Sequence, residues 1–214
     1  MYDKKRCPLM LALVCVLVLI AGCSATSPTA TAIAHGDAHA DQGAYDAALA
    51  DYTQAIELQR DNDVADFRRA YAYQEKGDYD RAIADYDRVI QLNPIDANAY
   101  NNRGSDYAQK EDYNHAITDF TKAIQLAPDY AVAHSNRGIA SFQSGNDNQA
   151  ITDLTDAIQL RPDWAEAYYN RGSVYEEQSK REQAIADFKQ VIKLSNDTSL
   201  RGNAAEELQA LEAQ

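Results

Sequence analysis

Hydrophobic and polar positions recur along most of the chain with the spacing of amphipathic helices. Apolar side chains return every three to four residues in paired stretches, for example 97 to 110 and 113 to 126. A short polar or glycine-containing turn, such as those at Gly77 and Gly145, separates the two members of a pair. The pattern predicts antiparallel helix pairs and an all-α fold.

The helix pairs recur with a period of 34 residues, counted from Thr29 to Asp63 and onward. The chain divides without insertion into five windows, 29–62, 63–96, 97–130, 131–164 and 165–198. Every window has an alanine, then a bulky aliphatic residue, and two residues later an aspartate; the aspartates are Asp51, Asp85, Asp119, Asp153 and Asp187. Because one helix pair cannot bury its own apolar face, we expect the windows to stack in series.

Three windows also share an Asn-Arg-Gly triplet in register, at residues 102–104, 136–138 and 170–172. The period and the small-residue columns together resemble the tetratricopeptide repeat, over residues 29–198. The resemblance implies a right-handed α-α superhelix, a solenoid of five helix pairs. It also implies that the first helices line a concave groove and that this groove holds segments of partner proteins.

Small side chains predict that the two helices of each pair approach closely. The first helix carries Gly36, Ala70, Gly104, Gly138 or Gly172, and the second carries Ala48, Ala82, Ala116, Ala150 or Ala184. A larger side chain in either column should overpack the pair. We expect the space beside them to be filled by the column Tyr52, Tyr86, Phe120, Leu154 and Phe188.

The helix ends carry recognisable signals. Asp78, Asp112 and Asn146 stand where they can cap second helices, and Pro94, Pro128 and Pro162 stop second helices before the next window begins. Residues 199–214 place Leu200, Ala204, Leu208 and Leu211 on one face, which predicts a helix that caps the last pair. Smaller or polar residues in the first window, such as Ala32, predict weaker packing there.

The N-terminal segment 1–22 predicts an export signal. Three basic residues, Lys4, Lys5 and Arg6, precede an uncharged stretch from residue 8 to 22, which is shorter than the roughly 20 residues of a membrane-spanning helix. The segment ends in Leu-Ile-Ala-Gly-Cys and resembles the bacterial lipobox, which implies lipidation of Cys23. Residues 23–28 would then form a short tether to a membrane. A plain secretory signal and an uncleaved anchor are the alternatives.

Charge and composition exclude several classes of protein. Lys and Arg number 20 against 33 for Asp and Glu, so the net charge is -13, and an acidic surface of this kind is repelled by nucleic acid. The chain is 45% hydrophobic and 25% charged, which excludes a disordered chain and a multi-pass membrane protein. Only 3 cysteines are present, so we expect no disulfide framework.

The first helices supply the predicted partner-binding groove. Its side chains are polar, aromatic or aliphatic, with no Lys or Arg and with acidic residues toward the ends. Such a groove suits protein or peptide segments that offer apolar and also basic side chains. The predicted groove residues are Phe67, Tyr71, Asn98, Asn101, Ser105, Ser135, Ile139, Phe142, Tyr169 and Ser173. Phe67, Tyr71 and Phe142 could instead be core aromatics between helices.

The Asn-Arg-Gly triplets invite two further interpretations. Asn102, Asn136 and Asn170 match one column of the carboxylate clamp with which co-chaperones of the family grip acidic tails, but the lysines of that clamp are missing. We therefore do not expect binding of acidic tails. The arginines at 69, 103, 137 and 171 are expected to pair with the aspartate column as exposed ion pairs worth about 0 to 1 kcal/mol each.

No motif predicts a cofactor, a metal or catalysis. His35, Asp37, His39 and Asp41 could be drawn as a metal site, because residues four apart share a helix face, but no cysteine or third histidine supports them as ligands. The favoured hypothesis is a lipid-anchored scaffold on a membrane, in an envelope-assembly or adaptor role. A pilotin-like carrier of one envelope or secretion subunit is the first alternative, and a metal-binding or enzymatic protein is the second.

Overall fold

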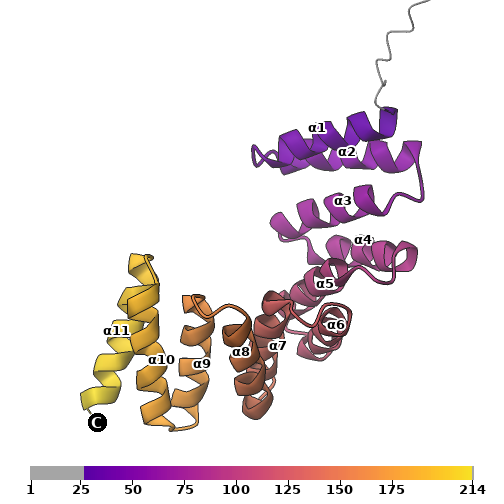
Figure 1. Ribbon diagram of the computed structural model, residues 1–214. Helices are drawn as coiled ribbons and strands as arrows, with labels where there is room; N and C mark the ends of the chain where they lie inside the picture. The colour runs from indigo at the N-terminus through magenta and orange to yellow at the C-terminus, as the bar shows by residue number, and fades with distance from the viewer. Residues whose placement is uncertain (1–26, 214) are drawn as a thin grey trace, which may run out of the picture.

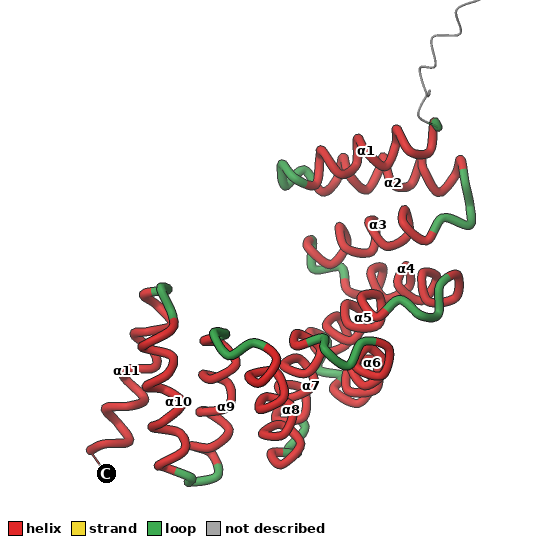
Figure 2. The backbone as a smooth tube through the Cα atoms, viewed as in Figure 1, coloured by secondary structure: helices red, strands yellow, loops and turns green. Residues whose placement is uncertain are grey.

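The computed structural model describes residues 27–213, and these form eleven α-helices and no strand (Figures 1 and 2). The first ten helices pair in the order of the chain, one pair to each 34-residue window, and α11 follows the last pair. Their bounds are α1 Pro28–Ala40, α2 Tyr45–Leu58, α3 Asp63–Glu75, α4 Tyr79–Leu92, α5 Ala97–Gln109, α6 Tyr113–Leu126, α7 Ala131–Gln143, α8 Asp147–Leu160, α9 Ala165–Glu177, α10 Arg181–Leu194 and α11 Thr198–Ala213.

The predicted helix caps are confirmed. The side chains of Asp78, Asp112 and Asn146 each accept a hydrogen bond from the backbone N–H three residues on, at 3.2, 3.2 and 3.3 Å. Ser27 does the same for α1, which begins with a proline whose missing N–H costs nothing in the first turn. These caps satisfy backbone donors that would otherwise lack a partner at the start of a helix.

The core of each pair is built from the predicted small and large columns. All five second-helix alanines, and all five larger residues four positions after them on the same helices, are at most 1% exposed. A Cβ added to Gly104 would lie 2.9 Å from the ring of Phe120, and one added to Gly36 would lie 2.4 Å from that of Tyr52. Backbone and ring therefore touch, and glycine is needed there for space.

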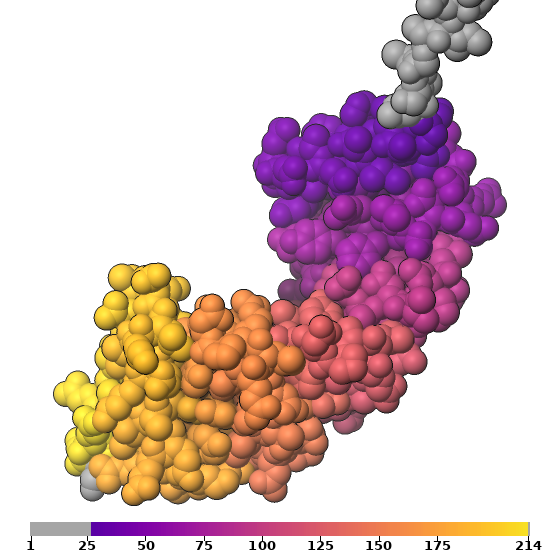
Figure 3. Space-filling view, viewed as in Figure 1, coloured from indigo at the N-terminus to yellow at the C-terminus, as the bar shows by residue number. Residues whose placement is uncertain are grey.

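The pairs stack into an arc that is hollowed on one side (Figure 3). First helices of neighbouring pairs contact each other directly along the described chain, α1 with α3, α3 with α5, α5 with α7 and α7 with α9, while second helices have no comparable mutual contact. The first helices therefore lie on the inner side of the curve, where the spacing is shortest. This arrangement is the solenoid that the period predicted.

Both ends of the described chain are helical and packed. α11 lies against α10 and buries Ala204 and Leu211, so the capping helix is confirmed. α1 packs along the whole of α2 but buries only small residues, among them Ala32 and Gly36. None of the helices in residues 27–213 is both long enough and apolar enough to cross a membrane.

Candidate functional site

Four arginines fix the first helices against their neighbours. Arg137 on α7 donates from Nε and Nη2 to the two carboxylate oxygens of Asp153 on α8, at 2.8 and 2.6 Å. Its Nη1 donates to Thr121 Oγ1 of the preceding pair, at 3.1 Å. The arginines at 69, 103 and 171 make the same two-oxygen contact to Asp85, Asp119 and Asp187, and each also reaches the preceding second helix.

These ion pairs are more buried than the sequence suggested. The pairing of Arg and Asp columns is confirmed, but the arginine side chains are only 16–19% exposed and the aspartates 0–11%. Removal of one member leaves an uncompensated buried charge, which costs roughly 3 to 5 kcal/mol. The expectation of exposed, weak pairs was wrong, because the aspartate column faces the interface between helices.

A continuous cleft runs across three first helices on the inner side of the arc. A cavity of about 410 Å³ lies between α5 and α7, and a second of about 210 Å³ lies between α7 and α9. Ile139 and Gln143 line both, so the two cavities adjoin along α7. The remaining lining is Ser105, Ala108, Gln109, Tyr113, Phe120, Asn136, Ala140, Phe142, Leu154, Asn170, Ser173 and Val174.

Some of the predicted groove residues line this cleft and others do not. Ser105, Ile139, Phe142 and Ser173 do, whereas Phe67 and Asn98 line a separate hollow of about 230 Å³ between α3 and α5. Tyr71 on α3 is 44% exposed and lines none of these cavities. These placements leave the binding role of the seven residues as a prediction.

Three further predicted residues face inward. Asn101 and Ser135 are only 5% and 2% exposed, so neither side chain is available to a partner. The Asn101 amide is occupied within the fold, because its oxygen accepts from Asn136 Nδ2 at 3.1 Å and its nitrogen donates to Asn102 at 3.2 Å. Tyr169 is half-buried against Phe188, with ring centroids 5.6 Å apart.

The lining of the cleft across α5, α7 and α9 has no Lys or Arg, whereas the separate hollow between α3 and α5 has one arginine. This arginine is Arg68, which occupies the same repeat column as Asn102, Asn136 and Asn170. Its Nε lies 3.3 Å from Asp37 Oδ1, which also accepts from the Tyr52 hydroxyl at 2.8 Å. Asp37 of the first helix is therefore engaged in structural contacts.

Sequence reasoning missed four amides that the cleft exposes. Gln109, Gln143 and Asn170 line it and make no side-chain hydrogen bond within residues 27–213, and Asn136 lines it too. A signal for the two glutamines was present, since they occupy the same repeat column as Asp41, Glu75 and Glu177, which were expected near the ends of the groove. An unpaired amide offers both a donor and an acceptor to a bound chain.

Comparisons with known proteins agree with this architecture. Tetratricopeptide repeat models match residues 33–97, 69–135, 140–179 and 165–197. The chain belongs to the tetratricopeptide repeat family. A comparison with curated proteins gave no match. The predicted lipidation site Cys23 and the segment before it lie outside the residues that the structure describes.

Solved structures of other proteins share the fold. A crystal structure of the MamA protein is 25% identical with a TM-score of 0.72, over 78% of this chain and 91% of that one. The pilF protein of Pseudomonas aeruginosa is 17% identical, with a TM-score of 0.74 over 87% of each chain. YrrB, described as having an unusual peptide-binding site, is 20% identical with a TM-score of 0.68, over 82% and 90%.

The end of α9, a helix that lines the cleft of this tetratricopeptide repeat protein, carries a group of interacting acidic residues. Burial, then Glu207 and Glu177, raise the pKa of the Glu176 carboxyl. Burial and the charges of Glu207, Glu176 and Glu206 also raise the pKa of the Tyr169 hydroxyl. Carboxylates that repel one another in this way favour a cation beside them.

The histidine and aspartate cluster at the N-terminal end is divided among separate contacts. His39 Nδ1 lies 2.7 Å from Asp51 Oδ2 on α2, which makes this histidine the partner of the aspartate column in the first tetratricopeptide repeat. His35 is exposed, and Asp37 contacts Tyr52 and Arg68. The four residues do not converge on a common point, and nothing favours them as metal ligands.

Proposed function

We propose that this protein is a lipid-anchored scaffold that binds an extended segment of a partner protein in the cleft across α5, α7 and α9. The observation that carries the proposal is that unpaired amides, an exposed isoleucine and a half-buried phenylalanine line one cleft. Gln109, Gln143 and Asn170 provide the amides, and Ile139 and Phe142 provide the apolar surface. The peptide-binding site named for YrrB supports a similar use of the fold here.

Each part of the cleft suits a different part of an extended peptide. Side-chain amides pair with peptide N–H and C=O groups, which every sequence offers, so they hold the backbone without selecting its sequence. Ile139 is 38% exposed and lies between the two cavities, where an apolar side chain of the partner would cover it. Selectivity would therefore come from the apolar anchors and from charge.

We infer the orientation of the bound segment from the acidic residues near the end of α9. Glu176, Glu177 and Glu207 lie near one another close to the end of α9, and their mutual repulsion is relieved when a cation arrives. We expect a Lys or Arg of the bound segment to lie at this end. Arg68, at the opposite end of the inner face, would favour an acidic or carbonyl-rich part of the same partner.

The anchor is proposed from the N-terminal sequence. Lipidation at Cys23, with the tether 23–28, would place α1 near a membrane. A short tether reaches roughly 20 Å at most when fully extended. The pilotin-like role is a narrower form of the same proposal, in which the cleft serves one dedicated envelope subunit.

Site-specific photo-crosslinking in living cells tests the proposed function. A photoreactive residue at Gln143, inside the cleft, should yield a defined crosslinked product. The same residue at Gln125, exposed on α6 and outside the cleft, is the matched control and should not yield it. Equal products from both positions, or none from Gln143, would count against the cleft. Loss of membrane association in Cys23→Ala tests the anchor separately.

A further inference from the structure

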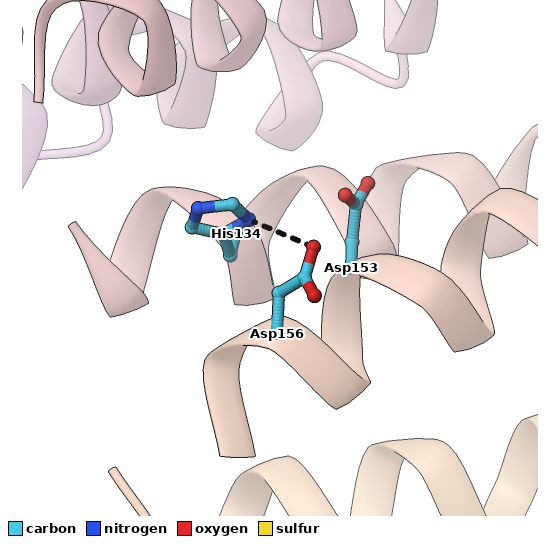
Figure 4. A group of neighbouring side chains, drawn as sticks. All are labelled: His134, Asp153 and Asp156. Carbon is cyan, nitrogen blue, oxygen red and sulfur yellow. Dashed lines mark ion pairs between the residues drawn. The ribbon is translucent and has the colours of Figure 1, made fainter. Parts of the chain in front are cut away.

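Three metal-ligating side chains converge where α7 meets α8, away from the cleft. They are His134 on α7 and Asp153 and Asp156 on α8, and their ligand atoms all lie within 4.8 Å of one another (Figure 4). His134 and Asp153 are buried, whereas the Asp156 side chain is 43% exposed. His134 and Ile139 are five positions apart along the chain, which places them roughly 140° apart around α7.

The histidine is oriented as a ligand. Its Nε2 lies 3.0 Å from the backbone oxygen of Pro128, and because a carbonyl only accepts, Nε2 must carry the proton. The neutral ring then presents a lone pair at Nδ1. That atom is buried, has no hydrogen-bond partner within residues 27–213, and lies 3.8 Å from Asp156 Oδ2. Metal-binding histidines are held by the same kind of bond from the second ring nitrogen.

The two carboxylates differ in how they are held. Arg137 fixes Asp153 through both oxygens, and each oxygen keeps a further lone pair that can face a cation. Asp156 makes no hydrogen bond within the described residues, so its side chain is free to turn toward His134. Two carboxylates and one guanidinium leave a net charge of -1 beside the imidazole, which attracts a divalent cation.

The other repeats show that this combination is particular to the fourth. In the column of His134 the second repeat has Asp66, whose carboxylate pairs with Arg88 at 3.1 Å in the column of Asp156. The fifth repeat has Tyr168, whose hydroxyl donates to the Pro162 carbonyl at 3.3 Å. A tyrosine thus satisfies that carbonyl equally well, and what the histidine adds is a second nitrogen facing two acids.

We propose that His134, Asp153 and Asp156 bind one divalent transition-metal ion of the Zn²⁺ class, with water completing the coordination. One imidazole and two carboxylates form a donor set that such ions accept. Ligand distances of about 2.0–2.2 Å require the donors to move closer than they are, and the exposed Asp156 can do so by rotation about its side-chain bonds. The bound ion would join α7 to α8 within one repeat.

Calorimetric titration of the tag-free full-length protein with Zn²⁺ tests this site, and Co²⁺ absorption gives a second readout. The wild type should bind one equivalent at the site. His134→Tyr, the residue of the third and fifth repeats, and Asp156→Gln, the residue of the first and fifth, should each weaken binding by roughly 10- to 100-fold or more. Both substitutions already occur in this fold, and far-UV circular dichroism verifies that the variants are folded.

The matched control is His115→Gln. His115 is exposed on α6 and lies 2.6 Å from Asp112, so it is a histidine–aspartate pair without the third ligand. This variant should bind Zn²⁺ as the wild type does, and Zn²⁺ should raise the Tm of both but not of His134→Tyr. Failure of the wild type to bind, or binding that is unchanged in His134→Tyr, would overturn the proposal.

Discussion

Replacement of Asp106 by alanine should stabilise the protein, and more so at high pH. Asp106 on α5 is fully buried, and neither of its carboxylate oxygens has a hydrogen-bond partner within the described chain. The same column holds Ala72 and Ala140, which are buried against the preceding repeat, so alanine fits this position. Burial raises the pKa of Asp106 from 3.8 to about 8.

The sign and size of this pH-dependent stability difference follow from proton linkage. Between pH 4 and pH 8 the folded state keeps the Asp106 proton that the unfolded state has released, so the free energy of unfolding falls as pH rises. At about 1.4 kcal/mol per pKa unit, the loss is about 2 kcal/mol at pH 5, about 4 kcal/mol at pH 7 and about 6 kcal/mol at pH 9. Asp106→Ala removes this loss, apart from a pH-independent change in packing.

Urea denaturation followed by far-UV circular dichroism at pH 5, 7 and 9 measures the effect. The stability difference between Asp106→Ala and wild type should grow by about 4 kcal/mol from pH 5 to pH 9, with similar m-values. Asp129→Ala, which removes an exposed carboxylate in the turn before α7, is the matched control and should show no such growth. A difference that stays constant with pH would refute the assignment of a buried, protonated carboxyl.

Two further predictions concern backbone and packing. Gly104→Ala should destabilise the protein by roughly 1 to 3 kcal/mol, because its Cβ would lie 2.9 Å from Phe120. A Cβ at Gly202 meets nothing within 4 Å, so Gly202→Ala, the control, should be neutral or stabilising by up to about 1 kcal/mol. Equal Tm shifts for the two variants would contradict this prediction. Glu111→Gly should stabilise by about 1 kcal/mol, because Glu111 has φ 61° where three other repeats have glycine; a lower Tm would argue against strain there.

Much of the fold could be predicted because the residue types that specify a helix pair recur in the five repeats. The alanine and aromatic columns, the caps at Asp78 and Asp112 and the proline stops each recur at fixed spacing, so a helix pair is specified locally. The Arg and Asp columns were paired correctly from spacing alone. Their burial was not predicted, because a charged residue on a helix is expected to face solvent until the neighbouring repeat is placed beside it.

The site was harder to predict than the fold. Asn101 and Ser135 occupy the same repeat column as Phe67 and Tyr169. Side chains in this column point partly toward the second helix of the same pair, so the shorter Asn101 and Ser135 are buried. Arg68 was missed because its column holds asparagine in the three following repeats and alanine in the first. The approach of His134 to Asp156 depends on the antiparallel register of two helices, which periodicity within one helix does not reveal.

The affinity of the crosslinked partner segment for cleft variants tests the central claim most directly. Ile139→Ala removes the apolar anchor shared by both cavities, while Ile95→Ala removes an isoleucine that is 75% exposed in the turn before α5 and lines neither of them. With both variants folded, the claim predicts that Ile139→Ala weakens binding about tenfold or more, a loss of at least about 1.4 kcal/mol, and that Ile95→Ala binds as the wild type does. Equal affinity of the two variants would contradict capture in this cleft.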